Sequence, residues 1–190
     1  MRKSFENKKN EPELVITIPS ICPPELAHKF RARITLGVII QLIARSTEYV
    51  VIGAPFIQKA ISEDNQDFVR SLKSALRRGI HLHIISTDVG LKGFINSLCD
   101  ENQKNIHFFQ PKRNVEDTNQ LGSHAKFCIA DGKHVYIGSA NLTDPGLYGN
   151  LEMGVLVHGK VANQVSEFWN YLVDIGFFVE VDHQENKNNS

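Results

Sequence analysis

Two short polar stretches in the second half of the chain carry residue types that can act on a phosphate group. His124 and Lys126 alternate along a predicted strand over residues 123–130, so an imidazole and an ammonium group share one face of that strand. The next strand runs into Gly138-Ser139-Ala140-Asn141, a glycine-led turn that brings a hydroxyl, an amide and backbone N–H groups close to the strand end. Together these groups supply a nucleophile or proton donor, a positive charge and neutral hydrogen-bond donors, which suit anionic oxygens.

The sequence offers little to hold a metal ion. No convergent set of carboxylates accompanies these groups, and the three cysteines (Cys22, Cys99 and Cys128) are too widely spaced for a zinc motif. His81 and His83 share a strand face and resemble a ligand pair, but no third ligand is near them in the sequence. We therefore expect that pair to be solvated or hydrogen-bonded, and we predict neither a metal nor a cofactor.

The elements that must position the polar groups alternate between strand and helix patterns. Strands are predicted at 13–18, 48–54, 80–86, 105–109, 123–130, 134–138 and 151–158. Helices are predicted at 27–45, 65–78, 91–99 and 161–173. Asp131-Gly132 is a hairpin signal between two of the strands. The alternation predicts a single α/β domain, with a mixed, largely parallel sheet flanked by helices on both faces.

Length and composition limit the number of domains, the cellular location and the class of partner that we can expect. The chain has 190 residues, of which 42% are hydrophobic, so one domain can bury a real core. We predict a flexible N-terminal arm at 1–12, a catalytic domain at 13–181 and a flexible tail at 182–190. There is no apolar signal segment and no stretch long enough to span a membrane, and the unpaired thiols favour a cytoplasmic location. The zero net charge argues weakly against a nucleic-acid partner but does not exclude a local basic patch, such as Lys112 and Arg113.

The spacing of the polar residues resembles the HKD signature of the phospholipase D superfamily. Asp131 follows Lys126 by five positions, the Gly-Ser-x-Asn turn comes next, and an acidic residue stands eleven positions after the asparagine. The resemblance is close over this motif and looser over the α/β alternation from about residue 30 to 175. It implies a phosphodiester-cleaving enzyme whose catalytic residues are His124, Lys126, Asp131, Ser139, Asn141 and Glu152.

The chain holds one complete motif, whereas the family builds its site from two. It is therefore similar to the homodimeric bacterial endonucleases of this superfamily, in which a two-fold axis unites two motifs. The resemblance implies that His124 forms a phosphohistidine, that the second copy's histidine handles protons, and that Lys126 neutralises the phosphate. Ser139 and Asn141 would donate hydrogen bonds, Glu152 would help position a histidine across the site, and Asp131 would brace the motif.

Three functions fit these residues. The first, which we favour, is a metal-independent nuclease that cleaves DNA or RNA as a homodimer without stable membrane association. The second is a phospholipid headgroup hydrolase or transferase, and the third is a non-catalytic, nucleic-acid-binding subunit. The stretches ELVITIP, RARITLGVIIQLI and ANLTDPGLYGNLEMGVLV also resemble phospholipase-D-like proteins of DISARM-type phage defence. That resemblance implies a role in antiviral defence and other defence proteins as partners.

Overall fold

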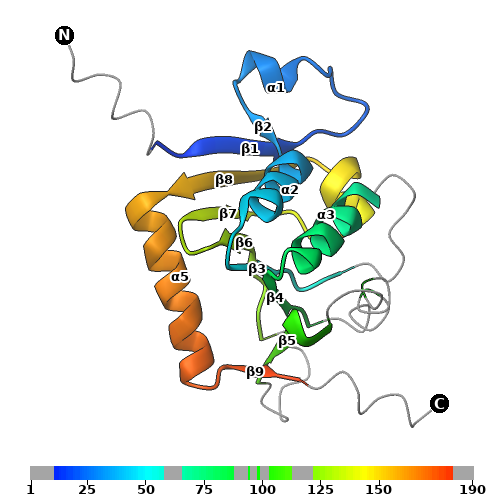
Figure 1. Cartoon of the computed structure of the whole chain (residues 1–190). Coiled ribbons are helices and arrows are strands. Elements are labelled where there is room, and N and C mark those ends of the chain that lie inside the picture. Colours follow the sequence, from blue (N-terminus) through cyan, green and yellow to red (C-terminus); the bar gives the residue numbers. More distant parts are fainter. Residues whose placement is uncertain are drawn as a thin grey trace.

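A nine-stranded mixed sheet forms the centre of the molecule (Figure 1). The structure is a computed structural model that describes residues 11–57, 66–87, 94, 98, 103–112 and 122–181. The strand order is β2-β1-β8-β7-β6-β3-β4-β5-β9. The strands are β1 (Glu13–Thr17), β2 (Arg33–Ile34), β3 (Tyr49–Gly53), β4 (His81–Ile85), β5 (Ile106–Pro111), β6 (Lys126–Ala130), β7 (His134–Gly138), β8 (Glu152–His158) and β9 (Phe178–Glu180).

Helices cover both faces of this sheet, as predicted. The α-helices are α1 (Leu26–Lys29), α2 (Thr35–Arg45), α3 (Gln66–Arg77) and α5 (Gly159–Asp174), with a 3₁₀ turn at Gln103–Asn105 and a π-helical turn at Pro145–Gly149. Figure 1 shows α2 and α3 on one side of the sheet and α5 on the other. A large core lies under α2 and α3, and a smaller one under α5 contains Trp169. Burial of these apolar faces holds the layers together.

Parallel and antiparallel pairs occupy different parts of the sheet. Strands β3, β4 and β5 are parallel to one another, and β1 is parallel to β2. The pairs β1–β8, β3–β6, β5–β9, β6–β7 and β7–β8 are antiparallel. The sheet is thus mixed, as predicted. Parallel pairs predominate only around β4, which is parallel to both of its neighbours. The hairpin at Asp131-Gly132 makes β6–β7–β8 a meander, and a meander is antiparallel by construction.

Two predicted elements differ from the structure. The helix predicted at 27–45 is broken, because Arg31 takes a left-handed backbone conformation (φ 52°) and the chain then forms β2 before α2. The strand predicted at 123–130 begins only at Lys126. Its neighbours end there, with Gly53 facing Phe127 and Gly138 facing Lys126, so the segment before Lys126 has no strand to pair with.

Some predictions fall on residues outside the described part of the chain. These are most of both predicted terminal arms, Arg113, and the predicted helix at 91–99 except for Phe94 and Leu98, which are helical and buried. No helix in the described ranges is long and apolar enough to cross a membrane.

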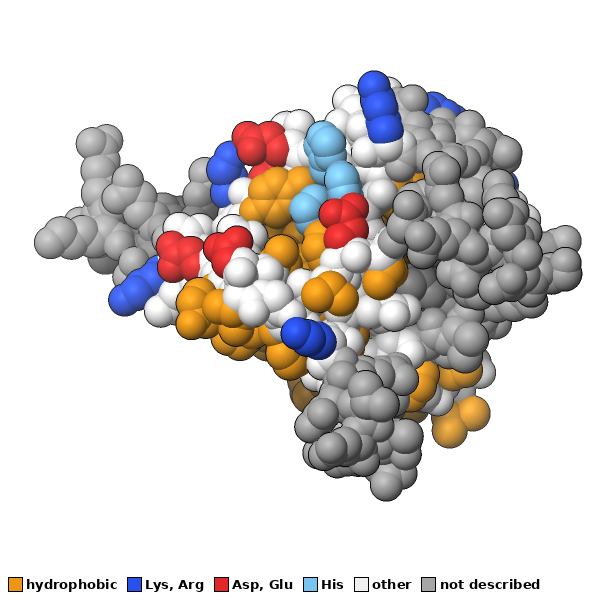
Figure 2. Space-filling view, turned by 90° about the horizontal axis from the view of Figure 1, so that it is seen from below, with side chains coloured by type: hydrophobic (Ala, Val, Ile, Leu, Met, Phe, Trp, Pro, Cys, Tyr) orange, Lys and Arg blue, Asp and Glu red, His pale blue; other side chains and the backbone are white. Residues whose placement is uncertain are grey.

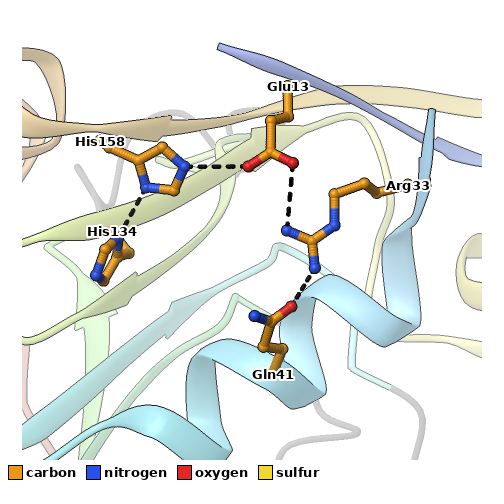
Figure 3. A network of polar contacts seen from close by, with 5 residues as sticks. All are labelled: Glu13, Arg33, Gln41, His134 and His158. Carbon is orange, nitrogen blue, oxygen red and sulfur yellow. Dashed lines mark hydrogen bonds and ion pairs between the residues drawn. The ribbon is translucent and has the colours of Figure 1, made fainter. Parts of the chain in front are cut away.

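A polar network connects strands β1, β2, β7 and β8 with helix α2 (Figure 3). Glu13 of β1 lies 3.5 Å from Nη1 of Arg33 on β2 and 3.2 Å from Nε2 of His158 on β8. His158 in turn contacts His134 of β7, with 2.7 Å between their Nδ1 atoms, and Arg33 donates to Gln41 of α2. The network links four strands and one helix at the edge of the sheet.

Candidate active site

His124 and Lys126 lie in direct contact at the start of β6. The Lys126 ammonium nitrogen is 2.9 Å from Nδ1 and 3.1 Å from Nε2 of His124, and it donates to the His124 carbonyl oxygen at 3.0 Å. His124 itself is exposed in the unpaired segment that precedes the strand. The imidazole is therefore open to a substrate, with a positive charge beside it.

Lys126 is unusual for a lysine because only 6% of it is exposed. Burial lowers the pKa of its ammonium group, since removal from water disfavours the charged form, whereas the Glu152 carboxylate raises that pKa. The Glu152 carboxylate thus favours the charged form of Lys126, although the lysine side chain is largely removed from water. A partly desolvated charge acts on a bound anion more strongly than one in water.

Ser139 and Glu152 meet at the ends of β7 and β8. The Ser139 hydroxyl donates to Oε2 of Glu152 and accepts the backbone N–H of Met153 at 3.1 Å. Asn150 Nδ2 donates to Oε1 of Glu152 at 3.5 Å. The serine and the carboxylate are therefore held as a unit by strand pairing rather than by a flexible loop.

Asn141 follows β7, and its side-chain oxygen Oδ1 is buried without a hydrogen-bond partner in the described part of the chain. An unpaired buried acceptor is costly, typically about 1–3 kcal/mol, so such a group points to a missing donor. The backbone of Asn141 is supported by Gly146 of the π-helical turn, where an added Cβ would lie 2.4 Å from the Asn141 carbonyl oxygen. Only glycine allows that approach.

Two facing glycines shape the end of the β7–β8 pair. Gly138 pairs with Gly154, and both pack against the buried side chain of Tyr136. A Cβ on Gly138 would lie 2.2 Å from the Tyr136 hydroxyl oxygen, and one on Gly154 would lie 2.6 Å from its ring. The glycine that opens the Gly-Ser-x-Asn turn is thus required by packing beneath the site.

The polar residues open onto a cavity of about 840 Å³ between the sheet and α5. Its mouth includes four of the predicted site residues, His124, Lys126, Ser139 and Asn141. Its walls are apolar and come from β6, β7, α5 and the segment after α5: Phe127, Ile137, Val165, Phe168, Trp169, Leu172, Phe177 and Phe178. The arrangement can hold an anionic group at the polar mouth and an apolar group against the wall.

A family model described as cardiolipin synthase, PLD-like domain, matches residues 39–173. The chain belongs to the phospholipase D superfamily. The match spans every predicted site residue, and the superfamily supports an enzyme that acts on phosphodiesters. A sequence search of curated proteins found no match.

Solved structures with this superfamily fold resemble the chain over most of its length. NucT from Helicobacter pylori is 18% identical with a TM-score of 0.62, and the match covers 90% of this chain and 100% of NucT. Nuc from Salmonella typhimurium, a phospholipase D family member, is 17% identical with a TM-score of 0.59, covering 90% and 99%. Phosphatidylserine synthase from Haemophilus influenzae is 13% identical with a TM-score of 0.64, covering 92% of this chain but 41% of the synthase. At these identities the similarities show the shared phospholipase D fold.

Asp131 lies apart from the other predicted residues of the phospholipase D motif, at the opposite end of β6. Its carboxylate accepts the backbone N–H groups of Thr47, Glu48 and Tyr49 at 2.9–3.0 Å, and the Thr47 hydroxyl at 3.0 Å. Burial raises the pKa of Asp131, but these four hydrogen bonds outweigh burial, and the net pKa is lowered. Asp131 pins the start of β3 to the β6–β7 turn.

Sequence reasoning missed the apolar wall of this cavity. The α5 residues repeat at helical spacing, which predicts a core-facing helix and gives no sign of a cavity. No group of three His, Cys, Asp or Glu side chains that converge on a metal position occurs in the described ranges, at this site or elsewhere. Of the two residues suggested as a local basic patch, Lys112 is exposed and Arg113 lies outside the described residues.

Proposed function

We propose that this protein is a metal-independent nuclease that cleaves DNA or RNA at a site shared by two copies of the chain. One observation carries the proposal: a buried lysine touches an exposed histidine at the mouth of a cavity that also contains Ser139 and Asn141. The motif occurs once in the chain, and the chain aligns with NucT and Nuc over nearly their whole length. A single-motif chain of this size resembles the homodimeric endonucleases of the superfamily.

In the first step of the proposed reaction, a neutral nitrogen of His124 attacks phosphorus. A P–N bond forms as the P–O bond to the leaving group breaks, and His124 of the partner subunit gives its proton to the departing oxygen. Lys126 stabilises the charge on the non-bridging oxygens, and Asn141 donates through its amide group. The product is a phosphohistidine, with the other DNA or RNA end released.

In the second step, water attacks the phosphohistidine. His124 of the partner subunit, now neutral, takes the proton from that water, and the P–N bond breaks to restore His124. One phosphoryl transfer thus needs two imidazoles in opposite protonation states. The described part of one chain supplies one such histidine at this cavity, which is why the proposal includes a second copy.

An exposed apolar strip beside the cavity supports a pairing surface for that second copy. Ile137 on β7 faces Val155 on β8, and Met153 follows on the same face. These side chains are 37%, 38% and 59% exposed. Exposed apolar side chains that adjoin a site are typical of interaction surfaces. A partner seated on this strip would bring its own His124 toward the mouth of the cavity.

The pairing is tested by sedimentation of wild type, Met153→Asp and Ile175→Asp. Ile175 is 56% exposed at the end of α5, so the same substitution there controls for added charge. We expect wild type and Ile175→Asp to be active dimers, and Met153→Asp to be a folded, inactive monomer. A fully active monomer would overturn the shared site.

The activity is tested with labelled single- and double-stranded DNA and RNA in excess EDTA. We expect cleavage with chelator present, loss of cleavage in His124→Ala, and a phosphorylated histidine trapped by acid-free quenching of a single turnover. Strict dependence on Mg²⁺ would contradict the mechanism. A steep fall of binding with salt would support a polyanionic substrate.

The apolar wall favours a second candidate, a phospholipid headgroup hydrolase or transferase. A cavity of about 840 Å³ lined largely by aromatic and aliphatic side chains can accept an acyl chain as well as a base. Phosphatidylcholine and phosphatidylglycerol in mixed micelles therefore belong in the same assay. Headgroup release at rates above those on nucleic acid would favour this candidate.

The resemblance to DISARM-type proteins supports a place in antiviral defence for the proposed nuclease. That placement depends on sequence resemblance alone. It predicts that cells carrying the complete surrounding defence genes resist phage, and that His124→Ala in this chain restores plaque formation. Unchanged resistance in the variant would mean that the chain acts as a non-catalytic, nucleic-acid-binding subunit.

A further inference from the structure

Three histidines gather on the sheet at the end opposite the candidate active site. His81 and His83 alternate along β4, and His107 of β5 is the strand partner of His83. The ring centroid of His107 lies 5.5 Å from that of His81 and 5.0 Å from that of His83. Figure 2, which views the molecule from below, shows histidine side chains gathered together with an acidic side chain next to them. The third histidine, which is not near His81 and His83 in the sequence, thus comes from the neighbouring strand β5.

The distance between two ring nitrogens suits a shared metal ion. Nδ1 of His81 lies 3.2 Å from Nε2 of His107. Two nitrogens bound tetrahedrally to one Zn²⁺, each at ~2.0–2.1 Å, lie about 3.3 Å apart. The two imidazoles can therefore share an ion with little movement.

Glu180 of β9 gives His107 the orientation that a metal ligand needs. Its Oε1 lies 2.8 Å from Nδ1 of His107, the ring nitrogen that faces away from His81. When Nδ1–H donates to this carboxylate, the lone pair of Nε2 is directed toward His81. A carboxylate behind a ligating histidine is a recurrent arrangement at metal sites, where it fixes the tautomer and raises ligand basicity.

A hollow beside His81 and His83 leaves space for water ligands. It has a volume of about 330 Å³ and is lined by Glu48, Tyr49, His81, His83, Trp169 and Asn170. His81 and Glu180 are exposed, so an ion can enter from solvent. No three candidate ligands in the described ranges already surround one point. Water, or His83 after a side-chain rotation, would complete the coordination.

We propose that His81 and His107 bind a divalent transition-metal ion, with Zn²⁺ the expected species and Glu180 as the residue that positions His107. Imidazole nitrogens favour zinc, copper and nickel over magnesium and calcium. Because the ligands come from β4 and β5 and the positioning carboxylate from β9, the ion would link three strands at the sheet edge. The site lies away from His124, so this proposal does not depend on the proposed nuclease activity.

The test uses protein without a histidine tag, stripped of metal with chelator and then dialysed. The His124→Ala form is the background, which removes metal binding at the candidate active site. Titration calorimetry with ZnCl₂ should give one ion per chain, and Co²⁺ should give visible absorption bands. At free Zn²⁺ near 100 times Kd, the melting temperature should rise by about 5–10 °C.

Single substitutions identify the ligands. We expect His81→Ala and His107→Ala each to abolish the one-to-one binding, and Glu180→Gln to weaken it about 10–100-fold. His134→Ala is the matched control, because His134 belongs to the other contacting histidine pair of the described structure, whose second member, His158, lies 3.2 Å from the Glu13 carboxylate. It should leave Zn²⁺ affinity unchanged.

Circular dichroism in EDTA checks that each variant folds. Absence of Zn²⁺ binding by the folded background protein would overturn the proposal, and so would unchanged affinity in both His81→Ala and His107→Ala. In either case the cluster would be a hydrogen-bonded chain from His81 through His107 to Glu180. Because binding and melting are measured without substrate, failure here is distinct from failure of the proposed nuclease.

Discussion

The ammonium nitrogen of Lys126 lies within 3.1 Å of both ring nitrogens of His124. A neutral imidazole is the form that can attack phosphorus. When a phosphate arrives, the same ammonium group can turn from the ring to the phosphate oxygens. In the proposed reaction the contact thus places a positive charge beside the nucleophile, where it can stabilise the charge that develops on the phosphate.

Lys126→Met should lower kcat by roughly 10²–10³, the usual effect of removing one group that stabilises transition-state charge. Methionine has a similar shape, so the buried stem remains packed. Lys133→Met, in the turn after β6, is the control and should keep wild-type activity. The measurement is hydrolysis of bis(p-nitrophenyl) phosphate in EDTA. Equal activity of the two variants would remove Lys126 from the mechanism.

Glu152→Gln should move the alkaline limb of the pH–rate profile to lower pH. Glu152 raises the pKa of Lys126 against the lowering effect of burial, so loss of its charge leaves that pKa lower and the ammonium group deprotonates earlier. Glutamine still accepts the Ser139 hydroxyl. Glu167→Gln on the exposed side of α5 is the control. An unshifted limb in Glu152→Gln would mean that Lys126 does not set it.

Asp131→Asn should destabilise the fold by about 1–3 kcal/mol, because an amide cannot accept all the N–H groups that face this carboxylate. That cost lowers the melting temperature by ~2–4 °C per kcal/mol. Asp174→Asn on α5 is the control, and activity per folded molecule should not change in either variant. A large loss of kcat in stable Asp131→Asn protein would instead make Asp131 part of the chemistry.

The Asp131 carboxylate also predicts an acid limit to stability. Its pKa is lower in the folded protein than in the unfolded chain, where an aspartate titrates at about 3.9. The stabilisation is therefore complete above that value and is lost as the pH falls through the folded pKa. Urea unfolding from pH 7 to pH 2 should show a steeper acid-side decline in wild type than in Asp131→Asn. Parallel curves would contradict the assignment.

Gly146→Ala should lower the stability of the fold and should lower activity per folded molecule at least 10-fold. The new methyl group would overlap the Asn141 carbonyl oxygen and so displace the amide from the mouth of the cavity. Gly149→Ala, in the same π-helical turn, has no atom within 4 Å of the added carbon and is the control. Steady-state kinetics should show the loss in kcat for Gly146→Ala alone.

Much of the site could be predicted from local spacing. Alternation along a strand predicts the contact between His124 and Lys126, although His124 precedes the paired part of β6. The hairpin signal predicts that Ser139 returns to the same end of the sheet. The contact between Ser139 and Glu152 then depends on the β7–β8 register, in which Gly138 faces Gly154.

The rest depends on packing between elements that are distant in sequence. The apolar wall exists because Trp169 of α5 packs on Phe109 and Phe127, and helix spacing alone does not say where a helix crosses a sheet. His107 reaches His83 through the parallel register of β4 and β5, which no motif records. β9 has only three residues, too few for a periodic pattern.

The place of β1 in the sheet has a consequence for synthesis on the ribosome. β1 pairs with the two-residue β2 and otherwise only with β8, whose residues are translated near the end of the domain. Val15 and Ile16, both buried in the finished protein, therefore leave the exit tunnel long before their main hydrogen-bonding partner exists. Until β8 has been synthesised, these two apolar side chains of β1 lack the strand that covers one edge of β1 in the folded protein. The pairing of β1 with β8 is thus a long-range contact, of the kind that slows folding.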